Sequence, residues 1–509
     1  MAELLVDQLR AMARRFPHEV AYVDLDTSDT IDFLQWETQS NKLARGLVGL
    51  GLQKGDRIAL HLPGTRLFPW MIGYAAIHKA GAVAVPTNTR LTPGELRTIL
   101  AHAEITAAFT CDDLLPSLQE VRALPTLRFV ANIDGATDTT IDIHAALDPD
   151  DSSFQVPVDE GDLADIMYTS GTTGLPKGVA VRHRNVGMIP NSEPAWSGKA
   201  WMHSSPLFTF AGIGFIYNPM KMGMGGLYQA NFDAGRWLDH VERRRPSMAF
   251  VVPAMAQLVI NHERFRDADL SSLTLLSIGS APLAPEILHV LLDRLPDASV
   301  SNSYGLTEAG PAFCVTPKEE AGRRAGSVGM PMPPMEIRIV EPGSDVDRAV
   351  GEHGEVLVRN KGRQREYYKD PDATARTWSR DGWLRTGDVG YLDEDGYLYL
   401  SGRLKEVIIR GGNNIYATDV EGVLYEHPAV LEAAVVGVSH DVLGEDVGAF
   451  VVTKPATSID ADELRAFCAE RLADYKVPRH IEFLDELPRN ATGKVLKNQL
   501  KEHEWHSTN

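Results

Sequence analysis

The chain has 509 residues, 44% of them hydrophobic and 23% charged, so it can bury a large core, and its length favours more than one domain. Its 50 basic and 69 acidic side chains give a net charge of −19, which argues against nucleic acid or an anionic membrane surface as the main partner. Three cysteines without CxxC spacing predict neither a disulfide framework nor a zinc site. The longest apolar stretch, 207–217, is shorter than the about 20 residues that cross a bilayer. We therefore expect a cytoplasmic protein without a membrane span.

Helical and strand-like segments alternate from residue 32 to residue 110. The stretch "TQSNKLARGLVGLG" has helical periodicity up to Gly51, "DRIALHLP" and "AVAVP" are short buried strands, and "LFPWMIGYAAIHKAG" is a helix between them. The next helix opens with a capping box, Thr92 with Glu95, and has Pro93 at its first position. The alternation resumes at 247–261 and at 273–295. It predicts a parallel sheet covered by helices.

The character of the chain changes near residue 400. Strand-like stretches at 395–402 and 406–412 precede a capped helix at 418–425, two further strands, a helix at 460–475 and the strand "IEFLD". This pattern predicts a small α+β domain. The fold class is therefore α/β, with a large N-terminal domain of helix-covered, largely parallel sheets plus a small β-rich part. We place that domain at 1–400, a hinge at 401–405, and a mobile C-terminal domain at 406–509.

The stretch "YTSGTTGLPKGV" (168–179) gathers small hydroxyl and glycine residues around one lysine. Most such clusters are ordinary surface loops. Small residues also let backbone N–H groups approach a polyanion, with hydroxyls and a lysine completing a phosphate cradle. The common cradle G-x-x-x-x-G-K-[ST] does not fit, because Pro176 precedes Lys177 and Gly178 follows it.

Four more stretches follow in order: "SYGLTE" (303–308), "LRTGD" (384–388), "SGRLKEVIIRGGNNIYATDVE" (401–421) and "LPRNATGKVLK" (487–497). Each alone is a weak signal. Together with the hydroxyl-rich loop, in this order and spacing, the chain resembles the adenylate-forming (AMP-binding) superfamily, which includes acyl-CoA synthetases. The resemblance covers nearly the whole chain. It implies that ATP, Mg²⁺ and coenzyme A are used to convert a carboxylic acid to an acyl-adenylate and then to a thioester.

The resemblance also implies roles for individual residues. The catalytic group comprises Lys494, which neutralises charge shared by the α-phosphate and the attacking carboxylate, together with Glu308 and Thr169, which carry magnesium. The phosphate loop is Thr169, Ser170, Gly171, Thr172, Thr173, Gly174 and Lys177, and the remaining nucleotide contacts are Gly279, Ser280, Ala281, Tyr304, Gly305, Thr307, Asp388 and Arg403. Among these, Tyr304 stacks on adenine and Asp388 accepts from the ribose hydroxyls. The hinge is Lys405, the CoA path passes Gly411 and Gly412, and the acyl pocket holds Phe208, Thr209, Phe210 and Gly212.

Three positions depart from the family pattern. Thr209 stands where many relatives have a histidine that gates the acyl channel, so substrate entry or selectivity differs. Ala417 and Asp419 stand where proline and glutamate are common, which alters the loop facing CoA. Glu406 replaces an aspartate, which is a small change.

The acid is expected to be hydrophobic: fatty, aromatic or bulky alicyclic. No acidic residue lies between Ser204 and Tyr217 to pair with an α-ammonium group, and five glycines offer either room for the acyl group or ordinary close packing: Gly212, Gly214, Gly223, Gly225 and Gly226. The nearest alternative is a stand-alone adenylating enzyme that passes its acyl group to a separate carrier or partner protein. A luciferase-like oxygenase and a non-enzymatic nucleotide-binding regulator are more distant alternatives. A homodimer stays open.

Overall fold

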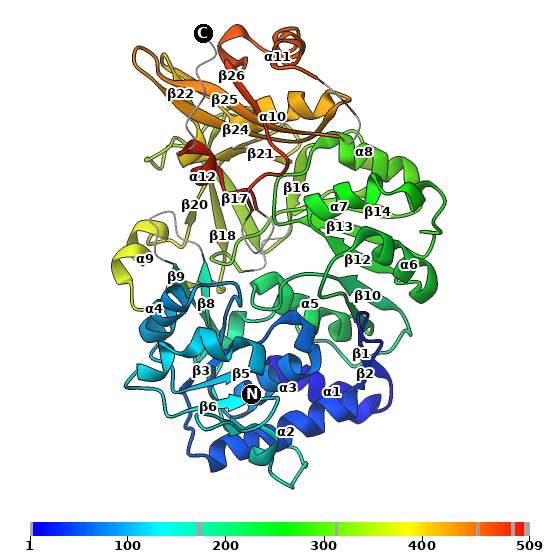
Figure 1. Ribbon diagram of the computed structural model, residues 1–509, viewed down its shortest axis with the longest axis vertical. Helices are drawn as coiled ribbons and strands as arrows, with labels where there is room; N and C mark the ends of the chain where they lie inside the picture. Colours follow the sequence, from blue (N-terminus) through cyan, green and yellow to red (C-terminus); the bar gives the residue numbers. More distant parts are fainter. Residues whose placement is uncertain are drawn as a thin grey trace.

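The computed structural model describes residues 4–169, 176–310, 314–454, 457, 459–489 and 494–502. A large domain holds three sheets, and a smaller domain built on a fourth sheet sits at one end of it (Figure 1). The predicted division into a large α/β domain and a small α+β domain is therefore confirmed.

Two largely parallel sheets form the body of the large domain. The eight-stranded sheet has the order β19 (Glu366–Tyr367), β9 (Lys177–Arg182), β8 (Leu163–Thr169), β4 (Val83–Pro86), β3 (Arg57–Leu60), β5 (Ala107–Thr110), β6 (Phe129–Asn132) and β7 (Ile141–Asp142). The seven-stranded sheet has the order β14 (Ser299–Ser303), β13 (Leu275–Gly279), β12 (Met248–Val251), β10 (Ala200–His203), β11 (Gly225–Tyr228), β1 (Val20–Asp24) and β2 (Thr30–Asp32). Only the pairings of β2, β9 and β19 in these two sheets are antiparallel, among the described strands.

Helices cover both faces of these sheets, as the alternating pattern predicted. They are α1 (Leu5–Arg15), α2 (Phe33–Gly49), α3 (Leu67–Lys79), α4 (Pro93–Ala103), α5 (Phe210–Lys221), α6 (Ala234–Arg244), α7 (Pro253–Ile260) and α8 (Pro285–Arg294). The predicted capping box is present, since Thr92 accepts from the Glu95 N–H and its own N–H donates to the Glu95 carboxylate. Helix α2 ends two residues before the predicted Gly51. No helix in the described ranges is long and apolar enough to span a membrane.

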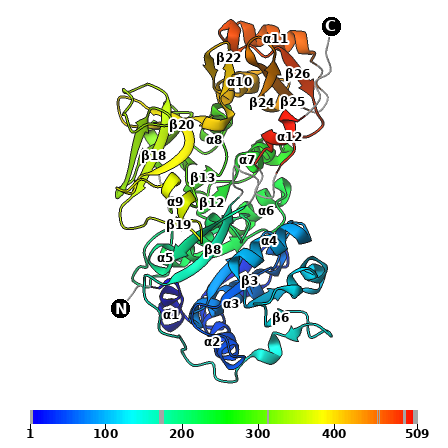
Figure 2. The same cartoon turned by 90° about the vertical axis from the view of Figure 1, so that its left-hand side faces the viewer.

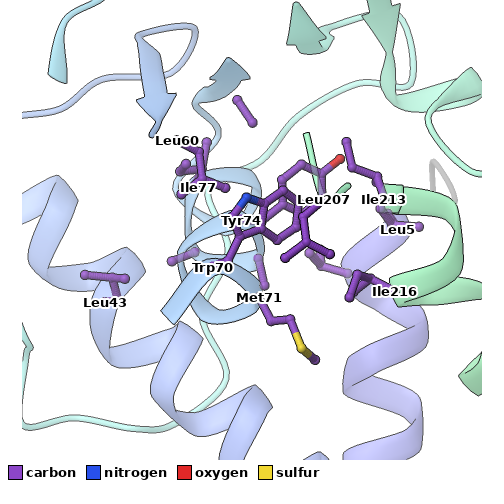
Figure 3. Close-up of a cluster of buried hydrophobic side chains, with 14 of the residues drawn as sticks. Leu5, Leu43, Leu60, Trp70, Met71, Tyr74, Ile77, Leu207, Ile213 and Ile216 are labelled. Atoms are coloured by element: carbon purple, nitrogen blue, oxygen red, sulfur yellow. The ribbon is translucent and has the colours of Figure 1, made fainter. Parts of the chain in front are cut away.

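One hydrophobic core joins the two sheets. Side chains of α1, α2, α3 and α5 pack together there, with Trp70 and Tyr74 stacked at a ring distance of 5.1 Å (Figure 3). A second core lies between the seven-stranded sheet and α6, α7 and α8, and a third between the eight-stranded sheet and α4. Burial of this much apolar surface fixes the carboxyl ends of β8, β13 and β14, which carry three of the predicted motifs.

The predicted β-rich part is a six-stranded sheet beside these layers (Figure 2). Its order is β15 (Cys314–Val315), β16 (Ser327–Pro331), β21 (Leu398–Arg403), β20 (Leu384–Leu392), β18 (Gly354–Asn360) and β17 (Met335–Val340), and the short helix α9 (Pro371–Thr377) lies nearby. Strand β21 includes residues 401–403, so the connection to the small domain begins at Leu404, within the predicted hinge at 401–405 but three residues after its start. It is a 3₁₀ turn, Leu404–Glu406, and Lys405 is exposed in it.

The small domain packs helices against a five-stranded sheet. The strands are β23 (Asn413–Ile415), β22 (Ile408–Arg410), β25 (Gly444–Thr453), β24 (Val430–His440) and β26 (His480–Phe483), and the helices are α10 (Ala417–Glu426), α11 (Ala461–Ala469) and α12 (Lys497–Lys501). The helix predicted over 418–425 is present as α10, but the expected side-chain cap is not made. The helix begins one residue earlier, and the Thr418 hydroxyl donates to the Ser401 carbonyl at 2.7 Å, which joins the small domain to β21.

Candidate active site

The hydroxyl-rich loop connects two paired strands. Thr169 ends β8 and lies opposite Lys177, the first residue of β9, in an antiparallel hairpin. The predicted phosphate-loop residues Ser170, Gly171, Thr172, Thr173 and Gly174 lie outside the described residues. The hairpin therefore fixes both ends of the loop.

Glu308 lies beside the start of that loop although it is 139 residues away in sequence. The Thr169 hydroxyl donates to Glu308 Oε1 at 3.1 Å, and both residues are half-buried. Thr307 and the exposed Gly305 belong to the same turn after β14. The two residues predicted to carry magnesium are thus brought together.

This pair fits a magnesium site that the substrate completes. The described residues contain no group of three or more His, Cys, Asp or Glu side chains that could hold a metal by themselves. Mg²⁺ commonly binds through one or two carboxylates while substrate phosphates and water supply its other ligands. One carboxylate with one hydroxyl agrees with that arrangement and not with an all-protein cage.

Asp388 is held by two donors. The register of β20 and β21 places Asp388 opposite Arg403, whose Nε lies 3.1 Å from Asp388 Oδ1. The Tyr304 hydroxyl donates to Asp388 Oδ2 at 2.5 Å. Burial raises the pKa of Asp388, whereas Arg403, the Tyr304 hydroxyl and Lys494 act in the opposite direction. A carboxylate has about four lone-pair sites, so Asp388 can accept two more hydrogen bonds.

Lys494 approaches this group from the small domain. Desolvation lowers the pKa of Lys494, and the nearby Arg403 adds to that effect, whereas Asp388, Glu308 and Glu406 favour its charged form. The side chain nevertheless keeps an exposed surface, so water reaches it although protein surrounds it at longer range. Helix α12, which follows Lys494, lies nearer to the large domain than β22 does in both views (Figures 1 and 2).

The predicted wall between adenine and acyl group lies at the end of β13. A side chain on Gly279 would come within 2.9 Å of the Ser303 carbonyl, so glycine is required where β13 meets β14. Ser280 follows with φ 73°, a left-handed conformation that is uncommon for a residue other than glycine. Ala281 is half-buried beside it.

The predicted acyl-pocket residues lie at the start of α5. Phe208 is half-buried, Phe210 is buried, and Thr209 caps the helix by accepting from the Gly212 N–H at 3.0 Å. A Cβ on Gly212 would lie 2.0 Å from the Pro206 carbonyl oxygen. The other four glycines are also filled by neighbours, Gly214 by Met188 and Gly226 by Tyr22 among them. Of the two explanations that the sequence left open for these glycines, close packing is the one that their neighbours support.

Gly411 and Gly412 form the two-residue turn between β22 and β23. Both have positive φ, 56° and 85°, as a tight turn of this kind requires. The hairpin alone accounts for both glycines, and their predicted place on the CoA path stays a prediction.

Two residues of this region, Arg365 and Tyr367, were not predicted from the sequence. Arg365 is buried and donates to the backbone carbonyls of Thr307 and Asn185, with its guanidinium 4.1 Å from the centre of the Phe210 ring. Burial lowers the pKa of Arg365 to about 10. Tyr367 contacts Glu308 and Lys177. The stretch "RQREYY" carries no periodicity or spacing that marks either residue.

Comparison with known proteins gives the family. Residues 9–368 match the AMP-binding enzyme family, and residues 419–494 match the AMP-binding enzyme C-terminal domain. The structure is similar to the crystal structure of the anthranilate CoA ligase AuaEII in complex with anthranoyl-AMP, with a TM-score of 0.87, 26% identity, and coverage of 98% of this chain and 96% of that one.

Relatives by sequence are similar over nearly their whole length. A feruloyl-CoA synthase of Amycolatopsis sp is 35% identical, covering 96% of this chain and 96% of that protein. A 3-[(3aS,4S,7aS)-7a-methyl-1,5-dioxo-octahydro-1H-inden-4-yl]propanoyl:CoA ligase of Rhodococcus jostii is 34% identical, covering 97% of each. A fatty acid–[acyl-carrier-protein] ligase of Streptomyces coeruleorubidus is 32% identical, covering 94% and 92%. The chain therefore belongs to the AMP-binding enzyme family, and its class is that of the AMP-forming acid–thiol ligases.

Proposed function

We propose that the protein is an ATP-dependent ligase that joins a hydrophobic carboxylic acid to coenzyme A by way of an acyl-adenylate. The observation that carries this proposal is the convergence of Lys494, from the small domain, with Glu308 and Asp388 of the large domain. A cation within electrostatic range of two carboxylates, one of them next to a hydroxyl-rich loop, suits a reaction that manages the charge of a triphosphate.

In the first half-reaction, a carboxylate oxygen of the acid attacks the α-phosphorus of ATP. The bond from that phosphorus to the oxygen bridging the β-phosphate breaks, and pyrophosphate leaves. Thr169 and Lys177, at the two ends of the loop, would hold the departing phosphates. Asp388 would accept from the ribose hydroxyls while keeping its bonds to Tyr304 and Arg403, and Tyr304 would offer its ring face to adenine.

Lys494 would neutralise the charge that the attacking carboxylate and the α-phosphate share. Three protein carboxylates already favour its ammonium form, and the bound nucleotide would favour it further. Glu308 with Thr169 would hold Mg²⁺, which supplies charge neutralisation at the phosphate oxygens when it is bound.

In the second half-reaction, the sulfur of the CoA thiol attacks the acyl carbonyl carbon. The bond to the AMP oxygen breaks, giving a thioester and AMP, and the thiol proton is released. The small domain would turn about Lys405 between the two steps, so that the face carrying Gly411 and Gly412 replaces Lys494 at the site.

The acid is proposed to be hydrophobic, with fatty, aromatic and alicyclic acids as candidates. The names of the three similar relatives include one acid of each kind. The start of α5 supports the same class, because Phe208 and Phe210 are aromatic and no carboxylate lies between residues 204 and 217 to bind an ammonium group. One of these relatives is named for a carrier-protein acceptor, so transfer to a separate carrier is the second candidate function.

The test is a paired assay of wild type and Lys494→Ala over a panel of hydrophobic acids, with pyrophosphate and acyl-CoA followed separately. We expect the substitution to lower pyrophosphate release by about 100-fold, because it removes a cation that acts on the transition state. Conversion of synthetic acyl-adenylate to acyl-CoA should be nearly unchanged. Lys501→Ala is the matched control, since Lys501 lies 3.8 Å from Glu445 and outside the site.

Three results would change the assignment. Pyrophosphate release without thioester would favour the carrier-protein function, which purified acyl-carrier protein in place of CoA would then test. Release with acetate alone would refute a hydrophobic acid. No acid-dependent release with any substrate would refute the ligase.

A further inference from the structure

Tyr367 lies between two charged groups of the proposed adenylation site. Strand β19 pairs antiparallel with β9, with Tyr367 opposite Val179. Alternate residues of a strand share a face, so Lys177, two residues before Val179, is a diagonal neighbour of Tyr367 on the same face. The Lys177 ammonium accordingly lies 4.9 Å from the centre of the Tyr367 ring.

The hydroxyl of the same side chain reaches Glu308. The distance from the Tyr367 oxygen to Glu308 Oε1 is 3.4 Å, long for a hydrogen bond, and Thr169 donates to the same oxygen at 3.1 Å. Both donors therefore use one carboxylate oxygen, and among the described residues they leave Oε2 for other ligands. The ordinary pKa of a phenol is about 10, so the Tyr367 hydroxyl is protonated at neutral pH and can donate.

The Tyr367 ring is itself held in place. Its backbone N–H donates to the Thr374 hydroxyl at 2.9 Å, and Trp378 packs edge-on against the ring at 5.2 Å. Two residues earlier, Arg365 donates to the carbonyl of Thr307, which directly precedes Glu308. The segment 365–367 thus contacts the turn at Glu308 twice: Arg365 binds the backbone carbonyl of Thr307, and Tyr367 binds the Glu308 carboxylate.

Lys177 and Glu308 form no ion pair with each other within the described part of the chain. A lysine and a carboxylate that pair directly would satisfy one another, and neither would be available to phosphate or metal. An aromatic ring gives the ammonium a neutral partner. A phenol hydroxyl likewise gives the carboxylate an uncharged donor.

We propose that Tyr367 is a positioning residue that keeps Lys177 and Glu308 apart and holds one oxygen of Glu308, so that the carboxylate can receive the magnesium of a magnesium–nucleotide complex. The inference rests on the proposed function in that it takes Glu308 to be the metal ligand. It differs from the predicted site, which drew on no residue between 309 and 387.

The test is calorimetric titration of ATP into the enzyme without acid, at a series of magnesium concentrations, for wild type, Tyr367→Phe and Tyr367→Leu. Tyr367→Phe keeps the ring over Lys177 and loses the donor, so the magnesium concentration for half-maximal ATP affinity should rise by about fivefold. Tyr367→Leu loses both and lets Lys177 pair with Glu308, so the rise should be about tenfold to thirtyfold. Tyr368→Leu is the matched control, because that half-buried tyrosine packs on His102 and Lys369 instead, and its magnesium requirement should stay within about twofold.

An unchanged magnesium requirement in both Tyr367 variants overturns the proposal, whatever happens to turnover. If Tyr367→Leu does not fold by its thermal melt, Tyr367→Phe alone decides. A wild type that binds magnesium–ATP but releases no pyrophosphate with any acid would refute the ligase function while leaving this titration valid. A wild type that binds no ATP in magnesium refutes both.

Discussion

Arg403 and Asp388 face each other across neighbouring strands, with 3.1 Å between Arg403 Nε and Asp388 Oδ1. Asp388 is buried on the large domain, whereas Arg403 is the last residue of β21, directly before the turn to the small domain. Asp388, the proposed ribose ligand, therefore forms its ion pair with Arg403 at the point where the two domains are joined.

Replacing Arg403 should make ATP binding more sensitive to acid. Burial already raises the pKa of Asp388, and Arg403 opposes that rise by favouring the carboxylate. Arg403→Met removes the opposition, so the pKa rises further and the acidic limb of ATP binding moves to higher pH. Calorimetry of ATP binding between pH 5 and 8 measures the limb. An acidic limb that stays at the wild-type pH would contradict this account, and Arg380→Met, at an exposed arginine, is the control.

Replacing Arg365 should destabilise the large domain. Arg365→Met leaves the Thr307 and Asn185 carbonyls without their charged donors. Hydrogen bonds to charged groups contribute about 1.5 kcal/mol each, so we expect a loss of about 3 kcal/mol in the free energy of unfolding. Arg365→Lys should not restore it, because one ammonium lacks the planar fork that reaches two carbonyls. Urea denaturation measures both variants, and full rescue by lysine would show that charge alone matters.

The protein should lose stability as the pH falls below 6.5, and His203 should account for part of the slope. Ser205 N–H donates to His203 Nδ1, and Nε2 lies 2.7 Å from the Tyr22 hydroxyl, which donates to the Phe215 carbonyl. This pattern needs a neutral ring, and burial lowers the pKa of His203 to about 3. Because the unfolded chain binds the proton first, stability is present above about pH 6.5 and is lost toward pH 3, by about 1.4 kcal/mol per pH unit.

His203→Gln should flatten that slope between pH 6.5 and 5, regardless of how much the substitution lowers the free energy of unfolding at pH 7. Urea unfolding at the two pH values gives the slope directly. His18→Gln, at a largely exposed histidine, should leave the slope as in wild type. Equal slopes in wild type and His203→Gln would mean that His203 is not held neutral.

Adding a methyl group at Gly212 should destabilise α5. The new Cβ would lie 2.0 Å from the Pro206 carbonyl oxygen, so the capping turn at Thr209 must shift, at a cost of about 1–3 kcal/mol. Gly94→Ala is the matched control, because Gly94 lies in the first turn of α4 with open space around it, and alanine there should stabilise by about 0.4–1 kcal/mol. Thermal melts compare the two. If Gly212→Ala leaves the melting temperature unchanged but alters the preference among acids, Gly212 lines the acyl pocket.

Local signals in the sequence were enough for the elements and the motifs. The Thr92 capping box and the alternation of strands and helices act over a few neighbouring residues, so the chain carries them wherever it folds. The family motifs named Thr169, Glu308, Asp388 and Arg403, and the structure brings these four residues into two contacting pairs. The motif at 487–497 likewise indicated Lys494, and the folded structure brings this lysine within electrostatic range of Glu308 and Asp388.

Tertiary structure alone decided the rest. Whether Gly212 leaves room depends on where the Pro206 carbonyl lies, and whether Thr418 caps a helix or bonds to Ser401 depends on how the small domain meets β21. Tyr367 reaches Glu308 and Lys177 only because β19 pairs with β9 across 188 positions of sequence, from Val179 to Tyr367. Such contacts are set by packing between distant segments, and no pattern of a few residues encodes that packing.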